Sequence, residues 1–155
     1  MAELARSGSR SLARQEASRV NQLLAPPGVQ ARIGAQCFGL FPKMAELDAV
    51  MTPGLQQRVI EAHPEIIFEL LADGSAVDRK KDPAGVRQRV RLLRGAGFIG
   101  AAACIAQTRT RGIATDDVLD AMACAFTAGR MCLGSAERFG ASEANASGLI
   151  SAIWR

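Results

Sequence analysis

Apolar residues recur at helical spacing in several stretches of the chain, and this pattern predicts its main elements. Helices are expected over residues 11–24, 35–51, 64–73, 84–95 and 115–133. Pro26 and Pro27 end the first of these helices and Gly74 ends the third, whereas Pro42 falls inside the second and threatens it. The pattern therefore indicates a chain dominated by helices.

Strand signals are fewer and shorter than helix signals. Residues 57–62 are expected to form a strand, because Val59 and Ile60 favour extended backbone, and His63 and Pro64 mark its junction with the next helix. The closing apolar run GLISAIW is expected to form a short edge strand. For FIGAAACIAQ, periodicity does not decide between a buried helix and a strand.

Length and composition favour one compact domain over residues 1–155, since 155 residues with 48% hydrophobic content can bury a single core. Residues 1–16 are expected to form a flexible leader. No stretch reaches the roughly 18 consecutive apolar residues of a membrane-spanning helix, so we expect a cytoplasmic protein with no membrane partner. An organelle transit peptide is the alternative for the Arg- and Ser-rich start, but Glu3 and Glu16 interrupt it.

The cysteine pattern argues against a zinc site. Cys37, Cys104, Cys124 and Cys132 form no CxxC pair, and each stands among apolar residues. A structural zinc site needs close cysteine pairs or added histidines, and His63 is the only histidine of the chain. We therefore expect four buried, reduced thiols.

The net charge of +4 rests on 19 basic residues against 15 acidic ones, and 16 of the basic residues are arginines. Arginine pairs bidentately with phosphate, so the bias favours a nucleic-acid or nucleotide partner. A GC-rich genome that prefers arginine codons explains the same bias.

Basic residues gather in the middle of the chain. Lys80 and Lys81 lie in a polar loop, and Arg87, Arg91 and Arg94 form a stripe along the helix that follows. These five side chains are the expected contacts to nucleic-acid phosphates. The alternative is an ordinary solvated helix face.

Three carboxylates gather at the start of the 115–133 helix. Asp116 and Asp117 complement the positive end of the helix dipole, with Thr115 as the expected N-cap. Asp120 lies one turn further on, before the apolar run AMACAF, where an unpaired charge is costly. Asp117 and Asp120 share a helix face, so the pair predicts a divalent-cation site.

Glu61 and His63 are further candidates, because they end the expected 57–62 strand. A strand end holds its side chain rigidly at the rim of a sheet, where α/β enzymes place reacting groups. The alternatives are a solvated glutamate and a capping or packed histidine.

Five segments in this order carry a resemblance to a known family: GAQCFGLFPKMAELD, VIEAHPEIIFELL, KKDPAGVRQRVRLL, DDVLDAMACAFTA and GLISAIW. Over residues 17–155 the chain resembles the predicted RNase H-like nucleases known as domain-of-unknown-function family 429, with EAHPE and DDVLDA as the specific motifs. The resemblance implies an RNase H-like fold whose acids hold two Mg²⁺ or Mn²⁺ ions for phosphodiester hydrolysis. It assigns metal binding to Glu61, Asp117 and Asp120, which with His63 form the expected catalytic set.

The chain departs from the family pattern at its start, because the usual first strand with a GxDG-like aspartate would lie upstream of residue 1. The expected fold class is thus α/β, RNase H-like, apparently N-terminally truncated, with a helix-dominated remainder. The expected function is a metal-dependent nuclease or a degenerate member of that family. The alternatives are a non-catalytic nucleic-acid or protein interaction module and a fragment of a longer reading frame. Uncovered sheet edges would favour a homo-oligomer.

Overall fold

A computed structural model describes residues 10–155 of the chain, which divides into two compact units, Met1–Met51 and Thr52–Arg155. Of the expected leader, residues 1–9 lie outside the described residues, and residues 10–16 belong to a helix. The single domain expected over residues 1–155 stays a prediction.

The first unit contains two helices, α1 (Arg10–Leu24) and α2 (Ala35–Val50), as the sequence predicted. The loop between them is fixed by side chains of α1: Gln22 Nε2 donates to Val29 O at 2.7 Å, and Gln22 Oε1 accepts from Ala31 N at 2.9 Å. The α2 helix continues through Pro42, which lacks the N–H that would close its turn.

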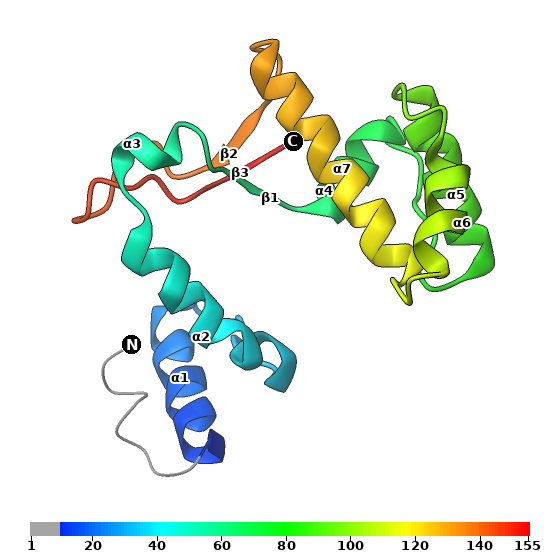
Figure 1. Cartoon of the computed structure of the whole chain (residues 1–155). Coiled ribbons are helices and arrows are strands. Elements are labelled where there is room, and N and C mark those ends of the chain that lie inside the picture. The colour runs from blue at the N-terminus through cyan, green and yellow to red at the C-terminus, as the bar shows by residue number, and fades with distance from the viewer. Residues whose placement is uncertain (1–9) are drawn as a thin grey trace. The chain divides into compact units, whose positions relative to one another are not determined.

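The second unit is built around its longest helix. Its helices are α3 (Pro53–Gln56), α4 (Pro64–Leu71), α5 (Pro83–Gly95), α6 (Ala101–Arg109) and α7 (Thr115–Cys132). Helix α7 packs against α4, α5 and α6, as Figure 1 shows. The buried core consists of Ile67, Phe68, Leu93, Leu119 and Ala123. The undecided segment FIGAAACIAQ therefore contributes a helix, which begins at Ala101.

Local sequence explains where these helices begin. Proline stands at the first position of α3, α4 and α5, where its missing N–H costs no helical hydrogen bond. Gly85 allows the start of α5 to approach the preceding loop, because a Cβ there would lie 2.1 Å from Arg79 O. The loop carrying Lys80 and Lys81 is thereby held close to α5.

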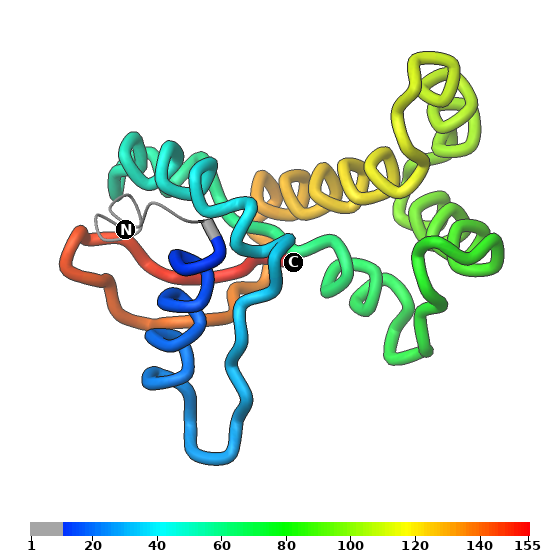
Figure 2. The backbone as a smooth tube through the Cα atoms, turned by 90° about the horizontal axis from the view of Figure 1, so that it is seen from below, coloured from blue at the N-terminus to red at the C-terminus, as the bar shows by residue number. Residues whose placement is uncertain are grey.

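The sheet has three short strands, β1 (Glu61–Ala62), β2 (Arg138–Gly140) and β3 (Ala152–Trp154). Their order is β1-β3-β2, with β1 parallel and β2 antiparallel to β3. Figure 2 shows the segments of β2 and β3, orange and red, running side by side. The C-terminal strand was expected at an edge, and this was wrong: β3 is central, because it pairs on both sides.

The strand expected over residues 57–62 is also corrected, since only residues 61 and 62 pair with β3. The N–H groups of Arg58 and Val59 both donate to Leu55 O at 2.9 Å, so they continue the turn of α3 and do not join a ladder. The architecture is helix-dominated with a small mixed sheet. Within residues 10–155, no helix has both the length and the apolar character needed to cross a bilayer.

Candidate nucleic-acid interface

An open groove of about 780 Å³ lies where the loop before α5 meets the end of α6 and the start of α7. Its charged lining comprises Lys80, Lys81, Arg87, Arg109, Asp116 and Asp117. Four basic side chains thus face two acidic ones. The groove combines residues that lie far apart in sequence, and its cationic groups outnumber its carboxylates.

Lys80 forms an ion pair with Asp120, and this pair joins the loop to α7. Lys80 Nζ donates to Asp120 Oδ2 at 3.0 Å, and the side chains are 38% and 24% exposed. The hydrogen bond to Asp120 raises the pKa of Lys80 above its ordinary value, against a smaller opposing effect of burial. The other carboxylate oxygen of Asp120, Oδ1, is buried and has no hydrogen-bond partner within residues 10–155.

Arg89 fixes the backbone that presents Lys80. Its side chain is 2% exposed, and its guanidinium donates to Glu65 Oε2 and to the carbonyl oxygen of Asp78, both at 2.6 Å. It also lies over the ring of Phe68, 5.0 Å from the centroid. Sequence reasoning missed Arg89, although it stands three residues after Val86, on the apolar side of α5.

The first turn of α7 carries Asp116 and Asp117 as predicted, but its cap differs from the prediction. Ala114 occupies the N-cap position and Thr115 is the first helical residue, because the N–H of Val118 bonds to Ala114 O. Asp116 is half-buried and Asp117 is exposed. Both line the groove, on the wall formed by α7.

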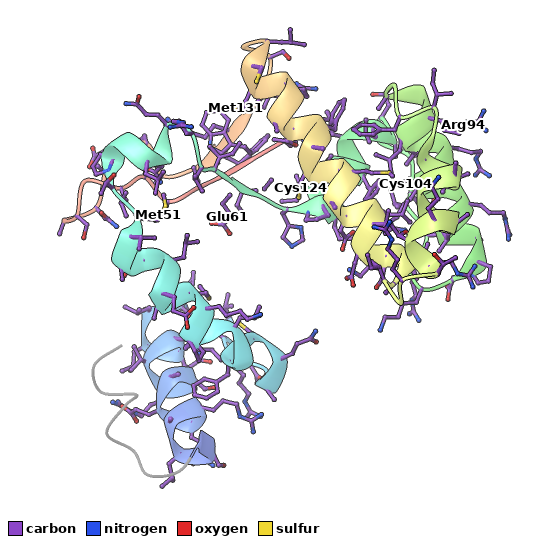
Figure 3. The ribbon with its side chains drawn as sticks, viewed as in Figure 1. Met51, Glu61, Arg94, Cys104, Cys124 and Met131 are labelled. Atoms are coloured by element: carbon purple, nitrogen blue, oxygen red, sulfur yellow. The ribbon has the colours of Figure 1, made fainter. Side chains whose placement is uncertain are left out.

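Glu61 and His63 belong to other elements than these aspartates, at β1 and at the start of α4. Figure 3 shows Glu61 on β1, and the side chains of Glu61 and His63 are exposed. His63 is the N-cap residue of α4 but makes no capping bond through its side chain. Asp120 is bonded to Lys80, and its expected place beside Glu61 or Asp117 stays a prediction.

The predicted metal ligands lie on separate elements, Glu61 on β1 and Asp117 and Asp120 on α7. Within residues 10–155, no three His, Cys, Asp or Glu side chains are placed to hold a metal ion. The ammonium of Lys80 already neutralises Asp120, where a divalent cation would have to compete with it. Among the described residues Glu61, Asp117 and Asp120 are thus not gathered into one group of ligands, and metal binding by them stays a prediction.

The arginine stripe of α5 divides into two parts. Arg87, Arg91 and Arg94 are all exposed, as expected for one face of the helix. Only Arg87 lines the groove, whereas Arg94, labelled in Figure 3, and Arg91 do not. Arg109, at the end of α6, lines it as well and was not foreseen, because its approach to α5 depends on tertiary packing.

The cysteines are free, as predicted, but they are not all buried. Cys37 and Cys132 are exposed, whereas Cys104 and Cys124 are partly buried, so apolar neighbours in the sequence do not ensure burial. Burial raises the pKa of the Cys124 thiol, and the nearby carboxylate of Asp120 raises it further. Figure 3 shows Cys124 on α7.

Fold and site together define a helix-dominated protein with a small mixed sheet and an open basic groove. The chain belongs to the family described as "Protein of unknown function (DUF429)", whose model matches residues 5–145. The family resemblance predicted from the motifs is thereby confirmed. Searches of curated proteins and of solved structures gave no match.

Proposed function

We propose that this chain binds a nucleic-acid backbone in the groove between α5, α6 and α7. The observation that carries the proposal is the convergence of Lys81, Arg87 and Arg109 on one open groove. All three side chains are exposed, and none has an ion-pair partner within residues 10–155. Exposed cations of this kind neutralise phosphates and release counterions.

The wall of the groove formed by the start of α7 offers hydrogen-bond acceptors for the parts of a nucleotide other than its phosphate. Asp116 and Asp117 are the carboxylates that line the groove, at the start of α7. Carboxylates accept hydrogen bonds from base amino groups and from ribose hydroxyls. Phosphates would therefore lie along the arginine side, with bases or sugars toward the start of α7.

Two double variants of equal charge test the proposal. Arg87→Gln with Arg109→Gln removes two groove cations, and Arg91→Gln with Arg94→Gln removes two exposed arginines outside the groove. At low salt, the groove variant is expected to bind a fluorescent oligonucleotide about tenfold more weakly than the control variant. Equal affinity of the two variants would contradict the proposal, because net charge alone would then explain binding.

A second candidate function is metal-dependent phosphodiester hydrolysis on an RNase H-like fold, with Mg²⁺ or Mn²⁺ as cofactor. The observation that favours it is the unpartnered Oδ1 of Asp120, one turn from Asp117. Melting curves with and without Mn²⁺ separate the two functions, since an ion that binds the folded state raises the melting temperature. A rise in the native protein that Asp120→Asn abolishes would favour hydrolysis, whereas equal curves favour binding without a resident ion.

A further inference from the structure

A second cavity, of about 430 Å³, lies beside the sheet at the end of α7 opposite to the groove. Every second residue of the C-terminal segment lines it, from Gly148 through Ile150 and Ala152 to Trp154. From Ile150 to Trp154 this period of two is that of an extended chain with one face toward the cavity, whereas Gly148 lies in the turn before it. Ile60 and Met131 add apolar lining from outside the strand, and the cavity volume falls in the range of about 300–1,000 Å³ usual for small-molecule sites.

Arg138 and Trp154 form the polar and aromatic parts of this cavity. They are directly opposed in the antiparallel pair of β2 and β3, so their side chains stand on the same face of the sheet. Within residues 10–155, the guanidinium of Arg138 has no ion pair and no hydrogen bond. Arg155 differs, because it bonds to Glu137 at 2.9 Å and lies over the Phe139 ring.

Small residues keep the space beside Trp154 open. Ala152 occupies the neighbouring lining position on the same face. Its partner Gly140 lets β2 and β3 pair closely, because a Cβ there would lie 2.4 Å from Ser151 O. The far wall is fixed by Gln56, whose amide donates to Ile150 O at 2.7 Å and accepts from Ile150 N at 2.9 Å. The cavity thus has a fixed wall, an aromatic surface and a cation without an acidic partner.

We propose that this cavity binds a planar aromatic ring that carries an anionic group, the chemistry of a nucleoside 5′-monophosphate or of a nucleotide within a strand. The ring would stack on Trp154, because base–aromatic stacking is favourable for every base. The phosphate would bond to Arg138, since guanidinium and phosphate form charge-assisted pairs. This site shares no residue with the groove, so the inference goes beyond the proposed function.

The chain contains one tryptophan and no tyrosine, so its fluorescence reports Trp154 alone. The experiment titrates the full chain with a nucleoside 5′-monophosphate, the matching nucleoside and a short oligonucleotide. Saturable quenching is expected with the monophosphate, and the nucleoside without phosphate should bind about tenfold more weakly. Quenching by the oligonucleotide alone would identify a base within a strand as the ligand. No saturable quenching by either phosphate-bearing ligand would overturn the proposal.

Variants assign any quenching to the cavity. Ala152→Leu fills the space beside Trp154 and should abolish quenching while the tryptophan remains, with a melting curve to verify folding. Arg138→Gln should weaken monophosphate binding about tenfold, whereas Arg58→Gln, exposed and outside the cavity lining, should not. Unchanged affinity in Arg138→Gln would overturn the proposal. The double variant Arg87→Gln, Arg109→Gln should keep monophosphate binding. Failure of the groove proposal can therefore be told from failure of the cavity proposal.

Discussion

Lys80 Nζ lies 3.0 Å from Asp120 Oδ2, across 40 residues of sequence, and this contact joins the loop before α5 to the head of α7. The contact supplies a structural reason for Asp120 in the acidic cluster at the start of α7. Asp120 has a cationic partner within the chain itself, so the carboxylates of α7 have a structural explanation that requires no metal ion. It also leaves Lys81, Arg87 and Arg109 as the cations that face the groove without an acidic partner among the described residues.

A double-mutant cycle measures this contact. Lys80→Met and Asp120→Asn each remove one partner, so the free energy of unfolding should show a coupling of about 1 kcal/mol between them. Lys80→Met should be the costlier single change, because it leaves a partly buried carboxylate without its counter-ion. The cycle requires urea unfolding of four proteins, and strictly additive effects would show that the pair contributes nothing.

Stability should depend on alkaline pH through the same pair. Asp120 raises the pKa of Lys80 in the folded protein, so the unfolded chain loses this proton first. The stabilisation that the Lys80–Asp120 pair gives the folded state is therefore complete below the pKa of an unfolded lysine. It is lost as the pH rises through the pKa of Lys80 in the folded protein. In urea unfolding from about pH 9 to pH 12, the free energy of unfolding should fall more steeply with pH for the native protein than for Lys80→Met. Parallel curves would contradict this assignment.

Arg89 should be the most sensitive arginine of α5. Arg89→Leu leaves Glu65 and the carbonyl oxygen of Asp78 without their donor. Because these hydrogen bonds involve a charged group, the free energy of unfolding should fall by about 2–3 kcal/mol. Arg91→Leu on the exposed face of the same helix is the matched control and should cost no more than about 0.5 kcal/mol. Chemical unfolding measures both variants, and an equal loss of unfolding free energy in the two would contradict the special role of Arg89.

The cysteines should differ in reactivity toward a thiol reagent. Burial and Asp120 raise the pKa of the Cys124 thiol, so the reactive thiolate is scarce there at neutral pH. Exposed Cys37 and Cys132 should be modified first. Mass spectrometry of peptides after timed labelling of the native protein checks the order, and early labelling of Cys124 would be inconsistent with its place in α7.

The helices could be predicted from the sequence because their signals are local. Apolar spacing located α4 and α5 closely, and Pro64 marked the start of α4. The sheet could not, since the central place of β3 depends on pairing with residues 61 and 138, which lie far away in the sequence. The pattern GLISAIW shows only that a strand exists.

The candidate site was predictable in part for the same reason. The basic loop pointed to Lys81 and the arginine stripe of α5 pointed to Arg87, and both line the groove. The partner of Asp120 could not be found from spacing along α7, because Lys80 reaches it from another element. Arg89 gave one detectable signal, a charged residue on the apolar side of its helix.

The salt dependence of oligonucleotide binding tests the central claim most directly. For a single strand, the logarithm of the affinity should fall with the logarithm of the salt concentration, with a slope of about −0.7 per neutralised phosphate. The three groove cations without an acidic partner in the described part of the chain, Lys81, Arg87 and Arg109, therefore predict a slope of about −2. Arg87→Gln with Arg109→Gln should reduce this slope to about −0.7, while Arg91→Gln with Arg94→Gln should leave it unchanged. Equal slopes for the two variants would contradict phosphate binding in the groove.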